Sequence, residues 1–142
     1  MLTIKQLTEN VGSAKVKVRG VELTVTPLSA AKSSELLGLC PAPPRPADEA
    51  DHQANTEYAR LYSGWVLAVE LHEFAVLVDY QLDDGAANRE RSFDFSAPTD
   101  AKRRWLECAR REIGGTLTRA EIQAVLRAAD KAARGTEDVR GN

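Results

Sequence analysis

The 142-residue sequence has few side chains of the kinds that perform metal or covalent chemistry. His72-Glu73 begins like the zinc-protease pattern H-E-x-x-H, but the second histidine would fall at a position occupied by Val76. The other histidine is His52, and two histidines with two distant cysteines do not supply the three or four ligands of a zinc site. We therefore expect solvated histidines and neither a metal nor a cofactor.

The two cysteines and the carboxylates also lack catalytic partners in the sequence. Cys40 and Cys108 are far apart, as is typical of free thiols in a reducing cytoplasm, and Cys108 is expected to be a buried structural residue. Glu70 and Glu73 share one face of a helix, where such a pair is usually solvated. Because we see no catalytic constellation, we expect that the protein is not an enzyme.

Charge is distributed unevenly along the chain. The overall formal charge is −2, but residues 102–134 contain nine basic and four acidic residues, a local charge of +5. Such a surface favours nucleic acid, an acidic protein partner, or the acidic middle of the chain itself. Six arginines would form this surface: Arg103, Arg104, Arg110, Arg111, Arg119 and Arg127. Base reading would need more Asn, Gln or Ser than Gln123 alone, so nucleic acid is the weaker alternative.

Length and hydropathy predict a single small domain over residues 1–134, with a disordered tail over residues 135–142. The N-terminus lacks the apolar core of a signal peptide. The most apolar run, residues 65–78, is shorter than a membrane span and is interrupted by Glu70, His72 and Glu73. We therefore expect a soluble cytoplasmic protein.

The first element should be a β-hairpin that leads into a helix. Apolar residues alternate over residues 16–25, and Arg19-Gly20 marks a tight turn. Pro27 ends the second strand, and Ser29 can cap a helix over residues 29–39 that buries Leu36, Leu37 and Leu39.

A proline-rich connector over residues 40–50 should separate this helix from a long amphipathic one. The second helix begins near Asp51, after acidic residues that suit a helix N-terminus. Large side chains then recur at three- and four-residue spacing, and we expect them to form the core-facing stripe: Tyr58, Leu61, Tyr62, Trp65, Val66 and Val69.

The segment 74–82 admits two interpretations, an extension of the helix or a strand. Alternation of Val76, Val78, Tyr80 and Leu82 favours a strand, which would pair with residues 91–95 in a second hairpin around a mobile loop at 86–89.

Two helices should complete the domain. The first starts at Ser96 or Thr99, carries an apolar face and ends at Gly114-Gly115. The second opens with a capping box formed by Thr118 and Glu121. The expected apolar faces contain Trp105, Leu106, Ala109 and Ile113 in the first, and Ile122, Val125, Leu126 and Ala129 in the second. The predicted class is α+β and mostly helical.

Three patches of the sequence resemble phage tail assembly chaperones. They are GVELTVTPLS at residues 20–29, the acidic-glycine turn and aromatic segment around residues 83–96, and the alanine- and leucine-rich last helix. The resemblance implies a protein that binds the tape measure protein, assists assembly of the tail tube protein around it, and self-associates.

If this resemblance holds, partner contact would occur in apolar grooves between helices. The residues expected to contact the partner are Leu36, Leu37, Trp65, Val69, Leu126 and Ala129. The alternatives are a small helical nucleic-acid-binding regulator and a virion structural or connector protein.

Overall fold

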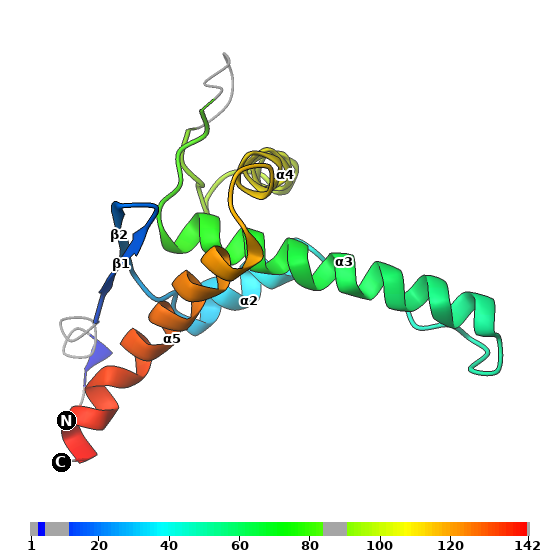
Figure 1. Ribbon diagram of the computed structural model, residues 1–142, viewed down its shortest axis with the longest axis horizontal. Helices are drawn as coiled ribbons and strands as arrows, with labels where there is room; N and C mark the ends of the chain where they lie inside the picture. The colour runs from blue at the N-terminus through cyan, green and yellow to red at the C-terminus, as the bar shows by residue number, and fades with distance from the viewer. Residues whose placement is uncertain (1–2, 5–11, 84–90, 142) are drawn as a thin grey trace.

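The computed structural model describes residues 3–4, 12–83 and 91–141 (Figure 1). The described residues form an α+β fold of four helices and one two-stranded antiparallel hairpin, which confirms the predicted fold class. The elements are β1 (Ala14–Val18), β2 (Val21–Val25), α2 (Ala30–Gly38), α3 (His52–Leu77), α4 (Thr99–Gly114) and α5 (Arg119–Gly141).

The N-terminal hairpin forms as predicted. Val18 pairs with Val21, and the two intervening residues have the positive φ angles of a type I′ turn: 51° at Arg19 and 81° at Gly20. Val25 is completely buried, and Val18 beside the turn is buried as well, so both ends of the hairpin pack on the core. This attachment fixes the direction in which the chain enters α2.

The start of α2 also agrees with the sequence. The Ser29 hydroxyl accepts a hydrogen bond from the Lys32 amide at 3.2 Å, and Leu36 is buried. Leu37, predicted to be buried, is 48% exposed, so that prediction is wrong. Lys102 on α4 donates to the Glu35 carboxylate at 2.6 Å and so ties the two helices together.

Helix α3 is longer than the sequence indicated. It continues through Leu77, so the predicted strand over residues 74–82 is wrong. Phe74, Ala75 and Leu77 are all buried, and a helix segment that is covered on several sides has no clear 3.6-residue period to distinguish it from a strand. Asp79, with φ 51°, ends the helix, and the Tyr80 amide donates to the Ala75 carbonyl at 2.8 Å.

The second hairpin is likewise wrong for the described residues, since the described sheet contains only β1 and β2. The Leu82 amide donates one hydrogen bond to the Arg91 carbonyl, at 2.9 Å, but the described residues on either side form no further strand-to-strand hydrogen bonds. The Phe93 ring packs on Trp105 and on Phe95, with centroids 5.3 and 4.8 Å away, so it packs on α4 instead of forming a strand. The predicted loop at 86–89 lies outside the described residues.

Helices α4 and α5 bury the predicted apolar faces. Most of the expected residues are buried, while Leu126 packs partly buried against the core. Helix α5 extends to Gly141, where the sequence predicted a disordered tail from Gly135. A single glycine costs about 1 kcal/mol in a helix and does not have to end it.

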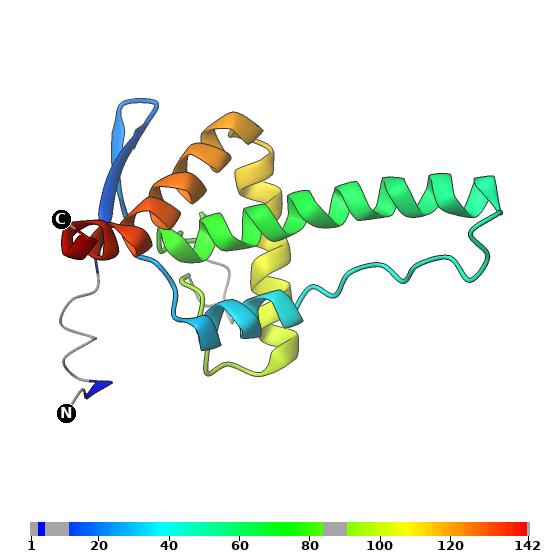
Figure 2. The same ribbon diagram turned by 90° about the horizontal axis from the view of Figure 1, so that it is seen from below.

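The N-terminal part of α3 projects from this core as an arm, together with the connector that runs beside it (Figures 1 and 2). We define the arm as residues 41–68. Trp65 Nε1 donates to the Cys40 carbonyl at 2.6 Å and holds the base of the connector. None of the six residues of the predicted core stripe is buried, because the buried part of α3 begins only at Leu71.

Candidate partner-binding surfaces

A shallow groove of about 210 Å³ lies where α2, α3 and α5 meet. We call it the α2–α5 groove. In Figure 2, α3 runs between α2 and α5. Glu73 and Leu77 of α3 form the floor of the groove. The lining residues are Pro27, Leu28, Ser33, Glu73, Leu77, Leu126, Ala129, Asp130 and Ala133.

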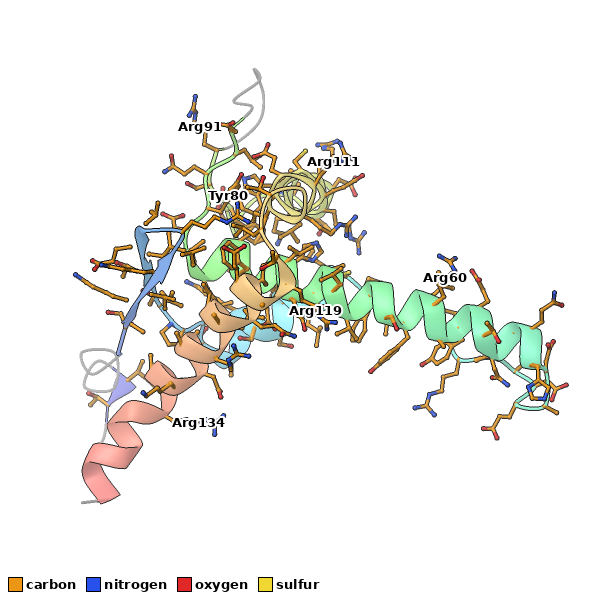
Figure 3. The ribbon with its side chains drawn as sticks, viewed as in Figure 1. Arg60, Tyr80, Arg91, Arg111, Arg119 and Arg134 are labelled. Carbon is orange, nitrogen blue, oxygen red and sulfur yellow. The ribbon has the colours of Figure 1, made fainter. Side chains whose placement is uncertain are left out.

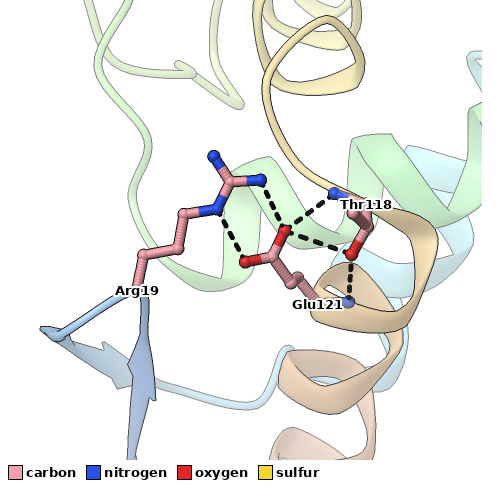
Figure 4. Close-up of polar contacts among 3 residues, drawn as sticks. All are labelled: Arg19, Thr118 and Glu121. Atoms are coloured by element: carbon pink, nitrogen blue, oxygen red, sulfur yellow. Dashed lines mark hydrogen bonds and ion pairs between the residues drawn. The ribbon is translucent and has the colours of Figure 1, made fainter.

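The capping box of α5 positions one wall of this groove. Glu121 accepts hydrogen bonds from the Thr118 amide and hydroxyl, and the Thr118 hydroxyl accepts one from the Glu121 amide. Glu121 also accepts two hydrogen bonds from Arg19, at 2.8 and 2.9 Å (Figure 4). The Arg19 guanidinium and the Thr118 donors lower the pKa of Glu121 to about 2. The start of α5 is thereby fixed to the turn of the hairpin.

A second pair fixes α5 to the floor. Arg119 donates two hydrogen bonds to Glu70, both at 3.1 Å, and Gln123 donates one more. The Glu70 side chain is only 18% exposed, so the prediction of a solvated Glu70 is wrong. The sequence did not reveal this contact because the two residues are 49 positions apart.

The groove combines an apolar lining with an acidic rim. Leu28, Leu77 and Leu126 supply apolar surface, while Glu73 and Asp130 lie at its edge. Asp130 accepts a hydrogen bond from Arg134 one turn further along α5, so a client cation would have to share this carboxylate. Partial burial raises the pKa of Glu73, and the nearby Glu70 carboxylate raises it further. The groove therefore suits an apolar side chain that is flanked by cations or hydrogen-bond donors.

Four of the six residues predicted to contact a partner lie in or beside this groove. Leu126 and Ala129 line it directly. Val69 lies one turn before Glu73, on the same face of α3. Leu37 lies one turn after Ser33 on α2 and offers further exposed apolar surface. Leu36 belongs to the core, with 3% of its surface exposed.

The sixth residue, Trp65, lines a different hollow, of about 420 Å³, between the arm and α4. We call this hollow the α4 corner. Its lining residues are Cys40, Pro41, Pro43, Leu61, Gly64, Trp65, Leu67, Ala68, Leu71 and Arg110. The sequence reasoning assigned Leu61 to the core and gave no role to Leu67. Their exposure could not be recognised before the position of α4 was known.

His72 is the clearest departure from the predicted histidines. It is 4% exposed, its Nδ1 has no hydrogen-bond partner among the described atoms, and its Nε2 is 3.5 Å from Arg110. Burial and the Arg110 charge lower its pKa from 6.5 to about 4. The prediction of a solvated histidine is wrong here, whereas His52 is exposed as expected.

The arginines predicted to form one basic surface do not lie on a single continuous surface. Arg119 pairs with Glu70, and Arg111 pairs with Glu107 on α4. Figure 3 shows Arg111 on α4 and Arg119 on α5 pointing to different parts of the surface. Arg104 and Arg110 form no ion pair within the described part of the chain. Any cationic surface is therefore centred on α4.

Among the described residues, no three His, Cys, Asp or Glu side chains gather closely enough to hold a metal ion. Cys40 and Cys108 form no disulfide, as predicted, and both are half-buried. None of the described helices is long and apolar enough to cross a membrane. Comparison of the chain with family models, curated proteins and solved structures finds no match.

Proposed function

We propose that this protein is a non-enzymatic phage tail assembly chaperone that binds the tape measure protein and assists assembly of the tail tube in the host cytoplasm. The observation that carries the proposal is the α2–α5 groove, which offers apolar surface between three helices on a small domain. The resemblance of three sequence patches to such chaperones supports the same function.

In this proposal, the groove receives one amphipathic helix of the tape measure protein. Apolar side chains of the client, spaced three and four residues apart, would cover Leu28, Leu77 and Leu126. Lysine or arginine residues beside that stripe would pair with Glu73 and Asp130 at the rim. The client would thus be kept from aggregating until tail tube subunits replace the chaperone.

Co-expression with the product of the next long downstream reading frame tests this function. We expect that product to become soluble and to co-elute with this protein. Leu37→Arg and Leu126→Arg should each abolish co-elution, because they place a cation where the client presents apolar and basic side chains. The matched control is Val21→Arg, which alters a 59% exposed apolar residue on the hairpin, away from the groove.

Thermal unfolding of each variant separates loss of binding from loss of folding. Leu126 is partly buried, whereas Leu37 is 48% exposed and can be changed with little cost to stability. If the downstream product stays insoluble with the wild-type protein, or if a folded Leu37→Arg variant still co-elutes, the proposed client site is wrong.

A nucleic-acid-binding regulator is the second candidate, and the exposed cations of α4 favour it. Arg103, Arg104 and Arg111 are exposed on one helix. This candidate predicts duplex DNA binding that weakens steeply with salt and is lost when Arg104 is changed to Glu. A virion connector, the third candidate, would instead remain in purified particles.

A further inference from the structure

The arm exposes apolar side chains on the face that borders the α4 corner. Leu61 is 44% exposed and Leu67 is 38% exposed, and Gly64 lies between them with open space above its Cα. The spacing of three residues keeps Leu61, Gly64 and Leu67 on one side of α3. A second helix could approach closely at Gly64 and insert side chains between the two leucines.

This face is distinct from the α2–α5 groove. Glu70 contacts Arg119 of α5, and Glu73 lines the groove, whereas Leu61, Gly64 and Leu67 line the corner with α4. A partner at the corner would therefore leave the groove accessible.

The two ends of this face carry opposite charges, so one copy could pair with a second copy of itself. The tip of the arm is acidic, with Asp48, Glu49 and Asp51 all exposed. Arg110 of α4 lines the corner, and Arg103 and Arg104 are exposed nearer the start of the same helix. A partner that carries an acidic end and an apolar middle would match the corner, and the arm of a second copy has both.

The lengths are compatible with such a pairing. Asp51 is 13 residues from Gly64, about 20 Å along the helix at 1.5 Å per residue. Leu71, where α4 meets α3, is seven residues from Gly64, or about 10 Å. The tip therefore reaches about 10 Å beyond the point where α4 meets α3. The two arms must cross at an angle at Gly64 for each acidic tip to lie along α4 of the other copy.

We propose that two copies of this chain form a two-fold symmetric dimer in which the arms cross antiparallel at Gly64. Leu61 and Leu67 of each copy cover the same residues of the other, and the tip with Glu49 approaches Arg103 and Arg104 of the partner copy. The interface is isologous, so both apolar faces and both charged contacts are satisfied by one closed pairing. The chaperone resemblance implies self-association in general; the arm-to-arm geometry is argued from the exposed residues of α3 and α4 and can be tested without a client.

Light scattering coupled to size-exclusion chromatography tests the dimer at concentrations up to about 100 µM, where micromolar association is visible. We expect a dimer that Leu67→Glu converts to a monomer, with a dissociation constant raised at least tenfold. The matched control, Val21→Glu on β2, changes a 59% exposed apolar residue away from both surfaces and should leave the dimer intact. Circular dichroism checks that both variants remain folded.

A charge exchange tests the orientation of the arms. Glu49→Lys and Arg104→Glu should each weaken the dimer about fivefold, and the combination should restore part of the affinity. A wild-type protein that stays monomeric at 100 µM, or a folded Leu67→Glu variant that still dimerises, overturns the proposal. Independent effects of the two charge reversals would overturn the antiparallel arrangement.

Discussion

Acidification should destabilise this protein through His72 at a pH where most carboxylates are still ionised. The pKa of His72 is lowered from 6.5 to about 4, so the folded protein binds a proton less readily than the unfolded chain. The free energy of unfolding is therefore unaffected by His72 above pH 6.5 and decreases as the pH falls from 6.5 towards 4. Burial is the main cause, and Arg110 adds to it.

The expected size of the effect follows from the two pKa values. Between pH 7.5 and pH 5, the preference of the unfolded chain for the proton amounts to about 2 kcal/mol in the free energy of unfolding. With a slope near 1.5 kcal/mol/M for a protein of this size, the urea midpoint should fall by about 1 M. Urea titrations followed by tryptophan fluorescence at several pH values measure this change.

Two variants isolate the contribution of His72. His72→Leu cannot bind a proton and removes the Nδ1 atom that has no partner, so its stability should be nearly flat over this range and equal or greater at pH 7.5. His52→Gln removes the exposed histidine and should keep the full dependence of the wild type. The raised pKa of Glu73 acts in the opposite direction, which is why the difference between wild type and His72→Leu is the quantity to compare.

The reasoning fails if wild type and His72→Leu lose equal stability between pH 7.5 and pH 5. It also fails if His52→Gln removes the pH dependence of stability, because His52 at the tip of the arm would then be the group that binds the proton, and not the buried His72.

Three further predictions concern stability. Leu106→Ala should cost about 2 to 5 kcal/mol because the side chain is 1% exposed, whereas Leu61→Ala should stay near 0.5 kcal/mol in monomeric protein, as urea titration will show. Glu121→Gln should lower the melting temperature more than Glu107→Gln, because Glu121 joins the capping box to Arg19 whereas Glu107 pairs with Arg111 along α4. The stabilisation by Glu121 should be lost as the pH falls from 4.5 towards the Glu121 pKa of about 2. Gly20→Val should cost more than Gly20→Asn, because φ is 81° and asparagine tolerates that conformation better; equal melting temperatures would contradict the assigned turn.

Local signals in the sequence were sufficient for the hairpin and for the start of α5. Arg19-Gly20 specifies a turn within two residues, and Thr118 with Glu121 specifies a cap within four. Both depend on backbone conformations and hydrogen bonds between near neighbours. Such features do not require knowledge of the rest of the fold.

The errors occurred where burial depends on distant elements. The apolar residues of α3 extend over most of its length, so their pattern did not show that only the part from Leu71 lies under α4 and α5. The same lack of contrast made the end of α3 resemble a strand. Contacts such as Arg119 with Glu70, and the burial of His72, arise from the packing of helices remote in sequence.

The dimer and the nucleic-acid alternative both use the cations of α4, and both should weaken with added salt. A change at the acidic tip distinguishes them. Glu49→Lys removes a contact with the partner copy in the dimer, so self-association should weaken. The same substitution adds a cation and removes an anion, so binding to duplex DNA should strengthen if the protein is a regulator. Opposite responses to one surface substitution, measured by light scattering and by DNA titration, therefore show which partner the α4 cations serve.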